Sequence, residues 1–559
     1  MPRATFLLLA TALAACSSSR TANLGENCTV ATDCGSGLTC YAPIVPGVCT
    51  QACANASSCP SGSACAPLVT SVGNQLCLGS CDSNANCLAG YTCCGALGNV
   101  CAPADRCSGM LTVIIPDLNC TPRSLVNGGV AGPPAQPASC QKPVVSTTFN
   151  GAQLQVLGAQ TVGNVIKFNV PAGTGTISIL QQVVDAGAPD TIVLPVAGTV
   201  PNAAVPFLLS GPDGGVFYSD DVVPNTDLSV MEVVLAPEAT AAAMILPNTT
   251  QALSHEAGGY PAGTWTMQVN DYAYECAHGD PTTIGCTGGK STQQYDIQIV
   301  TKPVMGATGT LDFGFYIVSD NWTAASAIAD PTEVWRRTLD AISSIYAHAG
   351  ICLGKITFYD VPAWAKAAYA TAVNANDANS CGTLDQMFTL GQPGGAIPIF
   401  FVDDIQASAS ANAGVVVGID GAIPGPPGAG GTVHSGALVN VSNITATTNC
   451  VAATSFRTCG PDEVGYITSH EAGHYLGLFH TTEFDGSLFD PIGDTSQCAL
   501  SCDTDKDGTL TGPECNDDSS TTASCGGADN TMFWLITAQA QGLFSPQQSR
   551  IIRSNPVVY

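Results

Sequence analysis

The stretch HEAGHYLGLFH carries three of the seven histidines in this 559-residue chain. His470 and His474 are four residues apart, so on a helix they project from one face and can bind the same metal ion. Glu471 points to the side of that face, where it can reach a metal-bound water without being a ligand. Gly477 can take a positive φ, so the chain can turn there and bring in His480. The pattern predicts zinc held by three histidines, with the fourth position open.

The same eleven residues match the HExxHxxGxxH signature of the metzincin metallopeptidases, which this part of the chain resembles. Downstream, ADNTMFW supplies Met532, similar to the methionine turn that lies beneath the zinc in this clan. Asn530, the stretch FDPIGDTSQC and the ending FSPQQSRIIRSNP resemble the pappalysin-like branch. The resemblance covers residues 303–559. Several metzincins have a tyrosine two residues after the methionine, but this chain has Trp534, so we expect no such role here.

The resemblance implies a zinc-dependent metalloendopeptidase that hydrolyses peptide bonds of extracellular proteins. Zinc would lower the pKa of its bound water, and Glu471 would take the proton as general base and pass it to the leaving amine. Zinc would also stabilise the oxyanion that forms during attack. An extended substrate is expected to pair with an edge strand, for which HSGALVNVS, residues 434–442, is the candidate. His434 in that strand is expected to be a surface residue rather than a ligand.

A second candidate metal site is DTDKDGTLTGPE, which matches the twelve-residue EF-hand calcium loop at each ligand position. Cysteines bracket it where an EF-hand has helices, so we expect disulfides to hold the loop. It lies between the third histidine and Met532, so bound calcium is expected to order the lower half of the active site. The alternative is a solvated acidic turn. The expected calcium ligands are Asp503, Asp505, Asp507, Thr509, Thr511 and Glu514.

The N-terminus, MPRATFLLLATALAAC, has the pattern of an export signal. Arg3 precedes a ten-residue apolar run that is too short to span a bilayer. The run ends in LAAC, which resembles a bacterial lipobox, so residues 1–15 are expected to be removed and Cys16 to be acylated. An ordinary signal cleaved elsewhere is the alternative. If Cys16 is acylated, membrane attachment would be through this lipid alone. Ser17 after it favours the outer membrane, again by resemblance to bacterial lipoproteins.

Charge and cysteine content limit the function classes. The chain has 43 acidic and 16 basic residues, a formal charge of -27, which argues against nucleic-acid binding because phosphates are neutralised by lysine and arginine. The expected partner is a protein or peptide substrate. Of the 27 cysteines, Cys16 is assigned to the lipid, and the even number that remains indicates disulfides and an oxidising compartment outside the cytoplasm.

Residues 28–107 contain three cysteine triplets with the same spacing, such as CTVATDCGSGLTC. The sequence between them is small and polar, so disulfides rather than an apolar core must hold these repeats. Zinc is the competing interpretation. It is disfavoured because five residues separate the cysteines, where zinc ribbons have two to four, and because no histidine is near.

The remaining chain is predicted to form a tether, a linker and two domains. Residues 16–27 form the tether, and residues 108–142, rich in proline and glycine, form a linker. Short β-branched segments over residues 143–302 predict an antiparallel β-sandwich. Residues 303–559 alternate between strand and helix patterns, which predicts a mixed α/β catalytic domain of metzincin type, with a twisted mixed sheet, the active-site helix and the methionine turn.

Disulfides are expected in both domains and in the linker, where Cys120 would pair with Cys140. Cys276 and Cys286 would staple one loop of the sandwich. The last four cysteines would form two nested pairs around the acidic loop, although other connectivities remain open. The candidates outside the repeats and the linker are Cys276, Cys286, Cys352, Cys381, Cys450, Cys459, Cys498, Cys502, Cys515 and Cys525.

Two other functions compete with the peptidase. The cysteine-rich repeats and the sandwich favour a surface adhesion or binding lipoprotein whose protease domain is inactive or secondary. A zinc hydrolase acting on a non-peptide bond is the other. The intact set of Glu471 and three histidines favours an active enzyme.

Overall fold

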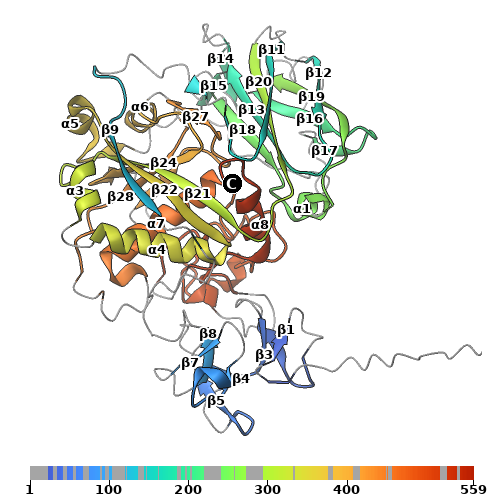
Figure 1. Ribbon diagram of the computed structural model, residues 1–559, viewed down its shortest axis with the longest axis vertical. Helices are drawn as coiled ribbons and strands as arrows, with labels where there is room; N and C mark the ends of the chain where they lie inside the picture. Colours follow the sequence, from blue (N-terminus) through green and yellow to red (C-terminus); the bar gives the residue numbers. More distant parts are fainter. Residues whose placement is uncertain are drawn as a thin grey trace, which may run out of the picture. The chain divides into compact units, whose positions relative to one another are not determined.

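The computed structural model describes most of the chain from residue 23 to residue 559 (Figure 1). The chain divides into two compact units, residues 1–108 and 109–559. The description excludes some shorter interruptions and the segments 1–22, 67–74, 104–119, 136–143, 185–190, 220–240, 272–293, 375–381, 407–415 and 517–524. The predicted signal peptide and Cys16 therefore lie outside the described residues, as do Cys140, Cys276, Cys286 and Cys381.

The first unit consists of small antiparallel ribbons joined by disulfides. Its strands are β1 (Asn27–Cys28), β2 (Thr39–Tyr41), β3 (Gly47–Thr50), β4 (Ala52–Cys53), β5 (Ser63–Ala66), β6 (Gln75–Gly79), β7 (Tyr91–Cys94) and β8 (Val100–Pro103). The disulfides are Cys34–Cys49, Cys53–Cys65, Cys59–Cys77, Cys81–Cys93 and Cys87–Cys101. In the second and third repeats the first cysteine joins the third, so the repeats share a connectivity as well as a spacing.

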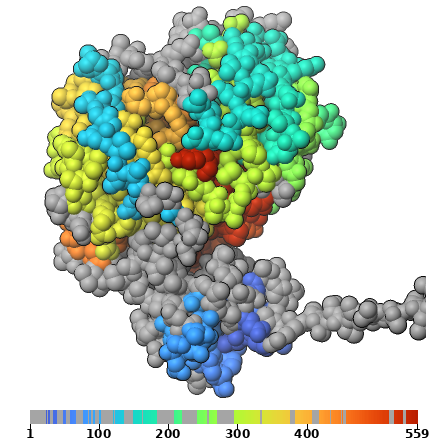
Figure 2. Space-filling model, in the orientation of Figure 1, coloured from blue at the N-terminus to red at the C-terminus, as the bar shows by residue number. Residues whose placement is uncertain are grey.

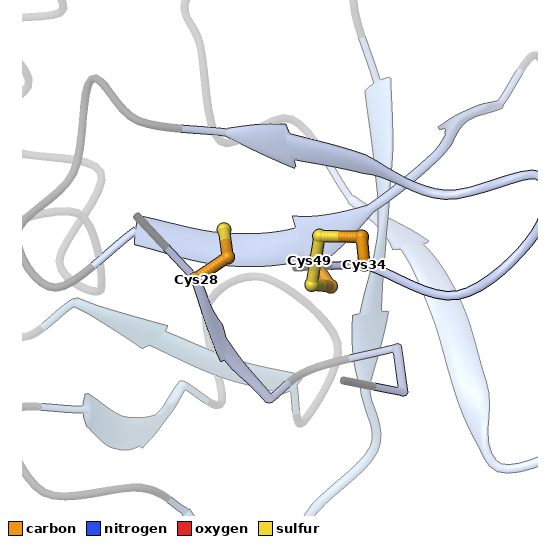
Figure 3. Close-up of side chains that lie close together, drawn as sticks. All are labelled: Cys28, Cys34 and Cys49. Carbon is orange, nitrogen blue, oxygen red and sulfur yellow. A yellow bond between two sulfur atoms is a disulfide. The ribbon is translucent and has the colours of Figure 1, made fainter. Parts of the chain in front are cut away.

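Three groups of cysteine sulfurs in this unit lie within metal-binding distance of one another. Figure 3 shows one group, in which Cys28 lies next to the Cys34–Cys49 disulfide. Cys28 is itself disulfide-bonded. A sulfur in a disulfide is not a thiolate and does not serve as a zinc ligand. The disulfide interpretation of the repeats is confirmed over the zinc one.

The predicted β-sandwich is present in the second unit. One four-stranded sheet has the order β11 (Gln153–Thr161), β20 (Gln294–Pro303), β13 (Thr174–Val183) and β18 (Ala241–Leu246). The other has β12 (Val165–Val170), β19 (Gly263–Asp271), β16 (Ala204–Ser210) and β17 (Val216–Ser219). Neighbouring strands are antiparallel, and both sheets contribute to one apolar core around the fully buried Trp265. Strands β14 (Thr191–Leu194) and β15 (Gly198–Pro201) form a separate ribbon.

A six-stranded mixed sheet forms the centre of the predicted catalytic domain. Its order is β26 (Gly418–Asp420), β28 (Ala437–Asn440), β24 (Ala396–Val402), β21 (Gly309–Ile317), β22 (Ile351–Asp360) and β9 (Ser124–Val130). Only β26 runs antiparallel to its neighbour. The helices are α3 (Ala324–Ala329), α4 (Val334–His348), α5 (Ala363–Tyr369), α6 (Thr383–Phe388), α7 (Gly460–Tyr475) and α8 (Pro546–Ser554). The predicted mixed α/β architecture is confirmed.

The two faces of this sheet bury different sets of side chains. Phe313 and Phe315 of β21 point to the core shared with α4 and α7. Tyr316, the residue after Phe315, points to the opposite face and to a second core shared with α5 and α6. Short elements complete the unit: β10 (Val144–Val145), β23 (Val373–Asn374), β25 (Ile405–Gln406), β27 (Ala429–Gly430), α1 (Thr250–Glu256) and several 3-10 turns.

The linker prediction for residues 108–142 is wrong where the structure describes them. Ser124–Val130 form β9, which pairs in parallel with β22, and Figure 1 shows it at one edge of the sheet. Cys120 pairs with Cys352 rather than with Cys140, across 232 positions of sequence. The six-stranded sheet thus takes one edge strand from upstream of the sandwich. The linker was predicted from the proline and glycine residues that follow this short strand, and they obscured its apolar residues.

The edge-strand prediction is also wrong. HSGALVNVS supplies β28, which lies between β24 and β26, so the edge strand is β26 instead. His434, just before β28, is partly buried rather than on the surface, and burial lowers its pKa to about 4. No apolar alternation marks the three-residue β26 as a further strand outside β28.

Disulfides near the end of the chain are confirmed in part. Cys450 pairs with Cys459. Cys498 pairs with Cys515, and Cys502 pairs with Cys525, so these two bridges interleave rather than nest.

Within the described residues, no helix combines the length and apolar character that crossing a membrane requires.

The sandwich contacts helix α8 of the α/β part. Lys302, the penultimate residue of β20, is buried and donates hydrogen bonds to the carbonyls of Arg553, Asn555 and Val558 at the end of α8. Arg550 of α8 donates to the carbonyl of Leu253 in α1 over 2.7 Å. The hydrogen bonds of Lys302 and Arg550 therefore attach the sandwich to the α/β part.

Candidate metal centre

Helix α7 carries the first two histidines, and contacts with helix α4 hold it in place. Pro461 occupies its first turn together with Asp462 and Glu463, which favour a helix start. Asp462 is buried and accepts two hydrogen bonds of 2.6 Å from Arg337 of α4. Gly465 allows α4 to approach closely, because a Cβ there would lie 2.6 Å from that of Ala341. These contacts fix the direction of α7.

The three histidines predicted as ligands converge. The Nε2 atoms of His470 and His474 lie 3.1 Å apart, and each lies 3.2 Å from Nε2 of His480. Tetrahedral zinc with bonds of about 2.0–2.1 Å would place its nitrogen ligands about 3.3 Å from one another. The triangle therefore fits a zinc ion with little movement of the side chains.

The second nitrogen of each imidazole is also bonded. Nδ1 of His470 lies 2.7 Å from the carbonyl of Thr531, and Nδ1 of His474 lies 2.7 Å from that of Leu478. A carbonyl only accepts, so each Nδ1 carries the proton and each Nε2 presents its lone pair to the centre. Burial and repulsion from the neighbouring rings lower the pKa of His470 to about 3 and that of His474 well below its usual value. Both rings are thus held neutral, as metal ligands must be.

The third histidine is reached by a turn directly after α7. Gly477 has φ of +105°, the conformation that the sequence pattern required of it. Beyond His480, the amide of Thr481 donates to the carbonyl of Met532 over 3.0 Å. Met532 is fully buried, and a Cβ added at Gly473 would lie 2.5 Å from its sulfur. The methionine turn therefore lies against α7 between the first two ligands.

Glu471 is buried beside the edge strand rather than on a flank open to water. The main-chain amide of Asp420 in β26 donates to its carboxylate, which lowers its pKa, but burial has the larger effect and raises that pKa to about 8. A Cβ at Gly418 would lie 2.3 Å from Oε1 of Glu471. Gly418 therefore makes the space that the carboxylate occupies, a role that sequence reasoning missed.

The acidic loop brings together part of its predicted ligand set. Carboxylate oxygens of Asp503, Asp505 and Glu514 lie within 4.8 Å of one another. Asp503 also accepts from the amides of Lys506 and Gly508, which wraps the loop around it. The other predicted ligands make local bonds: Asp507 accepts from the amide of Thr509, and Thr511 donates to Glu514. The three convergent carboxylates fit a calcium ion, which takes oxygen ligands.

Leu510, inside the acidic loop, connects it to the histidine site. Its amide donates to the carbonyl of Phe484 over 2.7 Å, four residues beyond His480. Its carbonyl accepts from the indole of Trp534 over 3.0 Å, two residues beyond Met532. Leu510 is fully buried among the four cysteines of the two interleaved disulfides. The loop is thus bonded to both segments that flank the candidate zinc site, a connection that no local sequence pattern indicates.

A cavity of about 230 Å³ lies on the opposite face of the sheet from α4 and α7. Its lining includes Asp312, Lys355 and Tyr359 of the sheet and Tyr559 at the C-terminus. Figure 2 shows the C-terminal residues, in red, at the surface between β9 and the sandwich. None of the three histidines lines this cavity, so it is separate from the candidate zinc site.

Comparison with known proteins adds little to this geometry. A scan against protein-family models finds no match, and a search of curated proteins finds no relative. Among solved structures, the chain matches the crystal structure of metalloproteinase-II from Bacteroides fragilis, with 12% identity and a TM-score of 0.24. The match covers 47% of this chain and 63% of that chain. Similarity this low carries no weight, so we base the function on the side chains.

Proposed function

We propose that this chain is a zinc-dependent metalloendopeptidase that hydrolyses extracellular proteins or peptides. One observation carries the proposal: three imidazoles present their Nε2 atoms to one point at zinc-binding separations, beside the buried carboxylate of Glu471. The arrangement combines a metal site with a general base, the two parts that hydrolysis of an unactivated amide requires. On the sequence motifs, we assign it to the pappalysin-like branch of the metzincins.

Each residue of the site has a separate task. Bound zinc would supply Lewis acidity, which activates water and polarises a carbonyl. Glu471 takes the proton of the attacking water and delivers it to the leaving amine. Burial raises the pKa of its carboxyl in the metal-free site. The positive charge of bound zinc would lower that pKa again and favour the carboxylate, the form that accepts a proton. The amide of Asp420 holds the carboxylate in place.

The substrate would lie along β26. Val417 and Gly421 use main-chain groups to bond the β28 side, because Asn440 donates to Val417 and Gly421 donates to Gly436. In an antiparallel pair the bonding direction alternates, so Gly418 directs its main-chain groups to the outer edge. An extended peptide that paired there would pass next to Glu471, which Gly418 contacts.

Three further features complete the proposal. Calcium would bind the acidic loop and, through Leu510, order the segments on either side of the zinc site. The protein would act outside the cytoplasm, in keeping with its many disulfides. Acylated Cys16 would anchor it to the cell envelope, and mass spectrometry of the N-terminal peptide would test this directly.

Cleavage of a denatured protein mixture by the exported protein tests the main proposal. Cuts should disappear after zinc is removed with a chelator and return when zinc is added back. His474→Ala should bind no zinc at the site and make no cuts. Zinc bound at one equivalent without cleavage of any protein or peptide would contradict the peptidase and favour the adhesion function instead.

A further inference from the structure

The three predicted ligands differ in how their second nitrogen is held. His470 and His474 bond to main-chain carbonyls in the buried interior. His480 instead bonds to a side chain: its Nδ1 lies 3.0 Å from Oε1 of Glu483. His480 is also the one ligand of the three that lies beyond the end of α7. It therefore lacks a helical backbone to hold it, and its orientation depends on this contact.

The setting of His480 explains why a charged acceptor is needed there. The side chains of His480 and Glu483 are 24% and 38% exposed, so water competes for the imidazole proton. A carboxylate forms a stronger hydrogen bond with that proton than a neutral carbonyl does. It also makes the imidazole a more basic ligand, as carboxylate–histidine pairs do in other zinc sites.

The main chain of Glu483 is fixed by its own turn. Its amide donates to the carbonyl of Leu488 over 3.0 Å, and its carbonyl accepts from the amide of Gly486 over 2.9 Å. The next residue, Phe484, accepts from Leu510 of the acidic loop. Both polar groups of the Glu483 backbone are thus bonded, so its carboxylate is presented to His480 from a rigid base.

We infer that Glu483 is a positioning residue for His480 and contributes to the zinc affinity of the site. This inference rests on the proposed zinc site and adds a fourth side chain to the three ligands. Glu483 carries no catalytic role in it: the carboxylate acts through the imidazole and does not touch the substrate. Its loss should weaken zinc binding about 10- to 100-fold, the range found when such partners are removed.

Zinc affinity, measured by chelator competition on the metal-free exported protein, tests the inference without reliance on activity. Glu483→Ala should show the full loss. Glu483→Gln keeps the shape and one acceptor oxygen but not the charge, so it should fall between Glu483→Ala and the wild type. Asp485→Asn is the matched control, because Asp485 lies in the same turn and accepts hydrogen bonds from Ser487. It should bind zinc as the wild type does.

The outcomes separate this inference from the function it rests on. Loss of zinc in His480→Ala with wild-type affinity in Glu483→Ala and Glu483→Gln would overturn the inference alone. A wild-type protein that binds no zinc would overturn both. Equal weakening in Asp485→Asn and Glu483→Gln would also overturn it, since the effect would then follow from the charge of the turn and not from the bond to His480. Thermal unfolding of the metal-free variants establishes that each is folded.

Discussion

The histidine site and the acidic loop each gather three metal ligands, but they do so in opposite surroundings. In the first, His470 and His474 are buried, held neutral and bonded at their second nitrogens. In the second, Asp505 is exposed. A hydrogen bond from the main-chain amide of Asp507 lowers its pKa, but desolvation and repulsion from neighbouring carboxylates together raise that pKa above its usual value. The fold thus orients the histidines of the first site before any metal binds. The carboxylates of the second site repel one another, and a bound cation would offset that repulsion.

This difference predicts different tasks for the zinc and calcium ions that we propose for the two sites. A site that is already arranged can use its metal for chemistry, because little reorganisation accompanies binding. Where carboxylates repel one another, a bound cation stabilises the folded protein, because the cation binds the folded loop better than the unfolded chain. We therefore expect changes at the histidine site to affect rate and changes at the acidic loop to affect stability.

The largest expected effect is on the rate of peptide cleavage. Glu471→Gln keeps the shape of the side chain but cannot accept a proton, so kcat should fall by about 10²- to 10⁴-fold. Zinc content, measured by mass spectrometry of the metal, should stay at one equivalent. A variant that retained the wild-type rate would show that Glu471 is not the base.

A buried carboxyl that lies between the two sites in the sequence should make stability depend on pH. Burial raises the pKa of Asp490 to about 7, although Thr495 donates to it and lowers that pKa in part. The folded protein then binds a proton that the unfolded chain has lost, so stability should fall as pH rises from about 4 to about 7. Between pH 4 and pH 7 the free energy of unfolding should fall by up to about 4 kcal/mol through this group, and Asp490→Asn should remove that fall.

Denaturant unfolding of the wild type and Asp490→Asn at several pH values provides the measurement. The two curves should diverge as pH rises, with the variant the more stable above pH 7. Asp494→Asn is not a suitable control, because Asp494 accepts hydrogen bonds from Ser545 and Gln547 at the start of α8. The exposed Asp485 is a better one, and Asp485→Asn should not flatten the curve. Parallel curves for wild type and Asp490→Asn would refute the assignment.

Calcium should stabilise the fold without changing zinc content. At a calcium concentration one hundred times its Kd, binding to the folded state alone adds about 2.7 kcal/mol to the free energy of unfolding. Asp503→Asn with Asp505→Asn should abolish this gain, while zinc affinity changes much less than in His474→Ala. Thermal unfolding with and without calcium tests the prediction, and an unchanged Tm for the wild type would count against calcium binding.

The smallest expected effect tests the edge strand. Gly418→Ala places a methyl group where Glu471 now lies, so the carboxylate must move. We expect kcat to fall by about tenfold, a loss of about 1.4 kcal/mol in transition-state stabilisation, with zinc content intact. Gly394→Ala, where a Cβ meets no neighbour, is not a matched control because its φ is +156°. Gly395→Ala has open space and no such strain, and should be neutral.

Local patterns in the sequence predicted the parts of the molecule that depend on neighbouring residues. The spacing of the histidines gave the triad, and alternation of apolar residues gave strands such as β12, whose residues are exposed and buried in turn. Helix α4 followed from its apolar positions for the same reason. These signals suffice because a helix face or a strand face is set within a few residues.

The features that were missed depend on contacts between distant segments. Cys120 meets Cys352 across 232 positions, and β9 joins a sheet whose other strands lie beyond residue 300. Leu510 and Trp534 meet through one hydrogen bond that no spacing rule describes. Glu483 is the exception: it lies three residues after His480, so its contact could have been found from the sequence.

X-ray absorption spectroscopy at the zinc edge of the exported protein tests the central claim most directly, because it identifies the atoms bound to the metal. Three imidazole nitrogens and one oxygen at about 2.0–2.1 Å are the predicted shell. Sulfur ligands at about 2.3 Å, or fewer than three imidazoles, would show that zinc lies elsewhere and would contradict the assignment of the histidine triad.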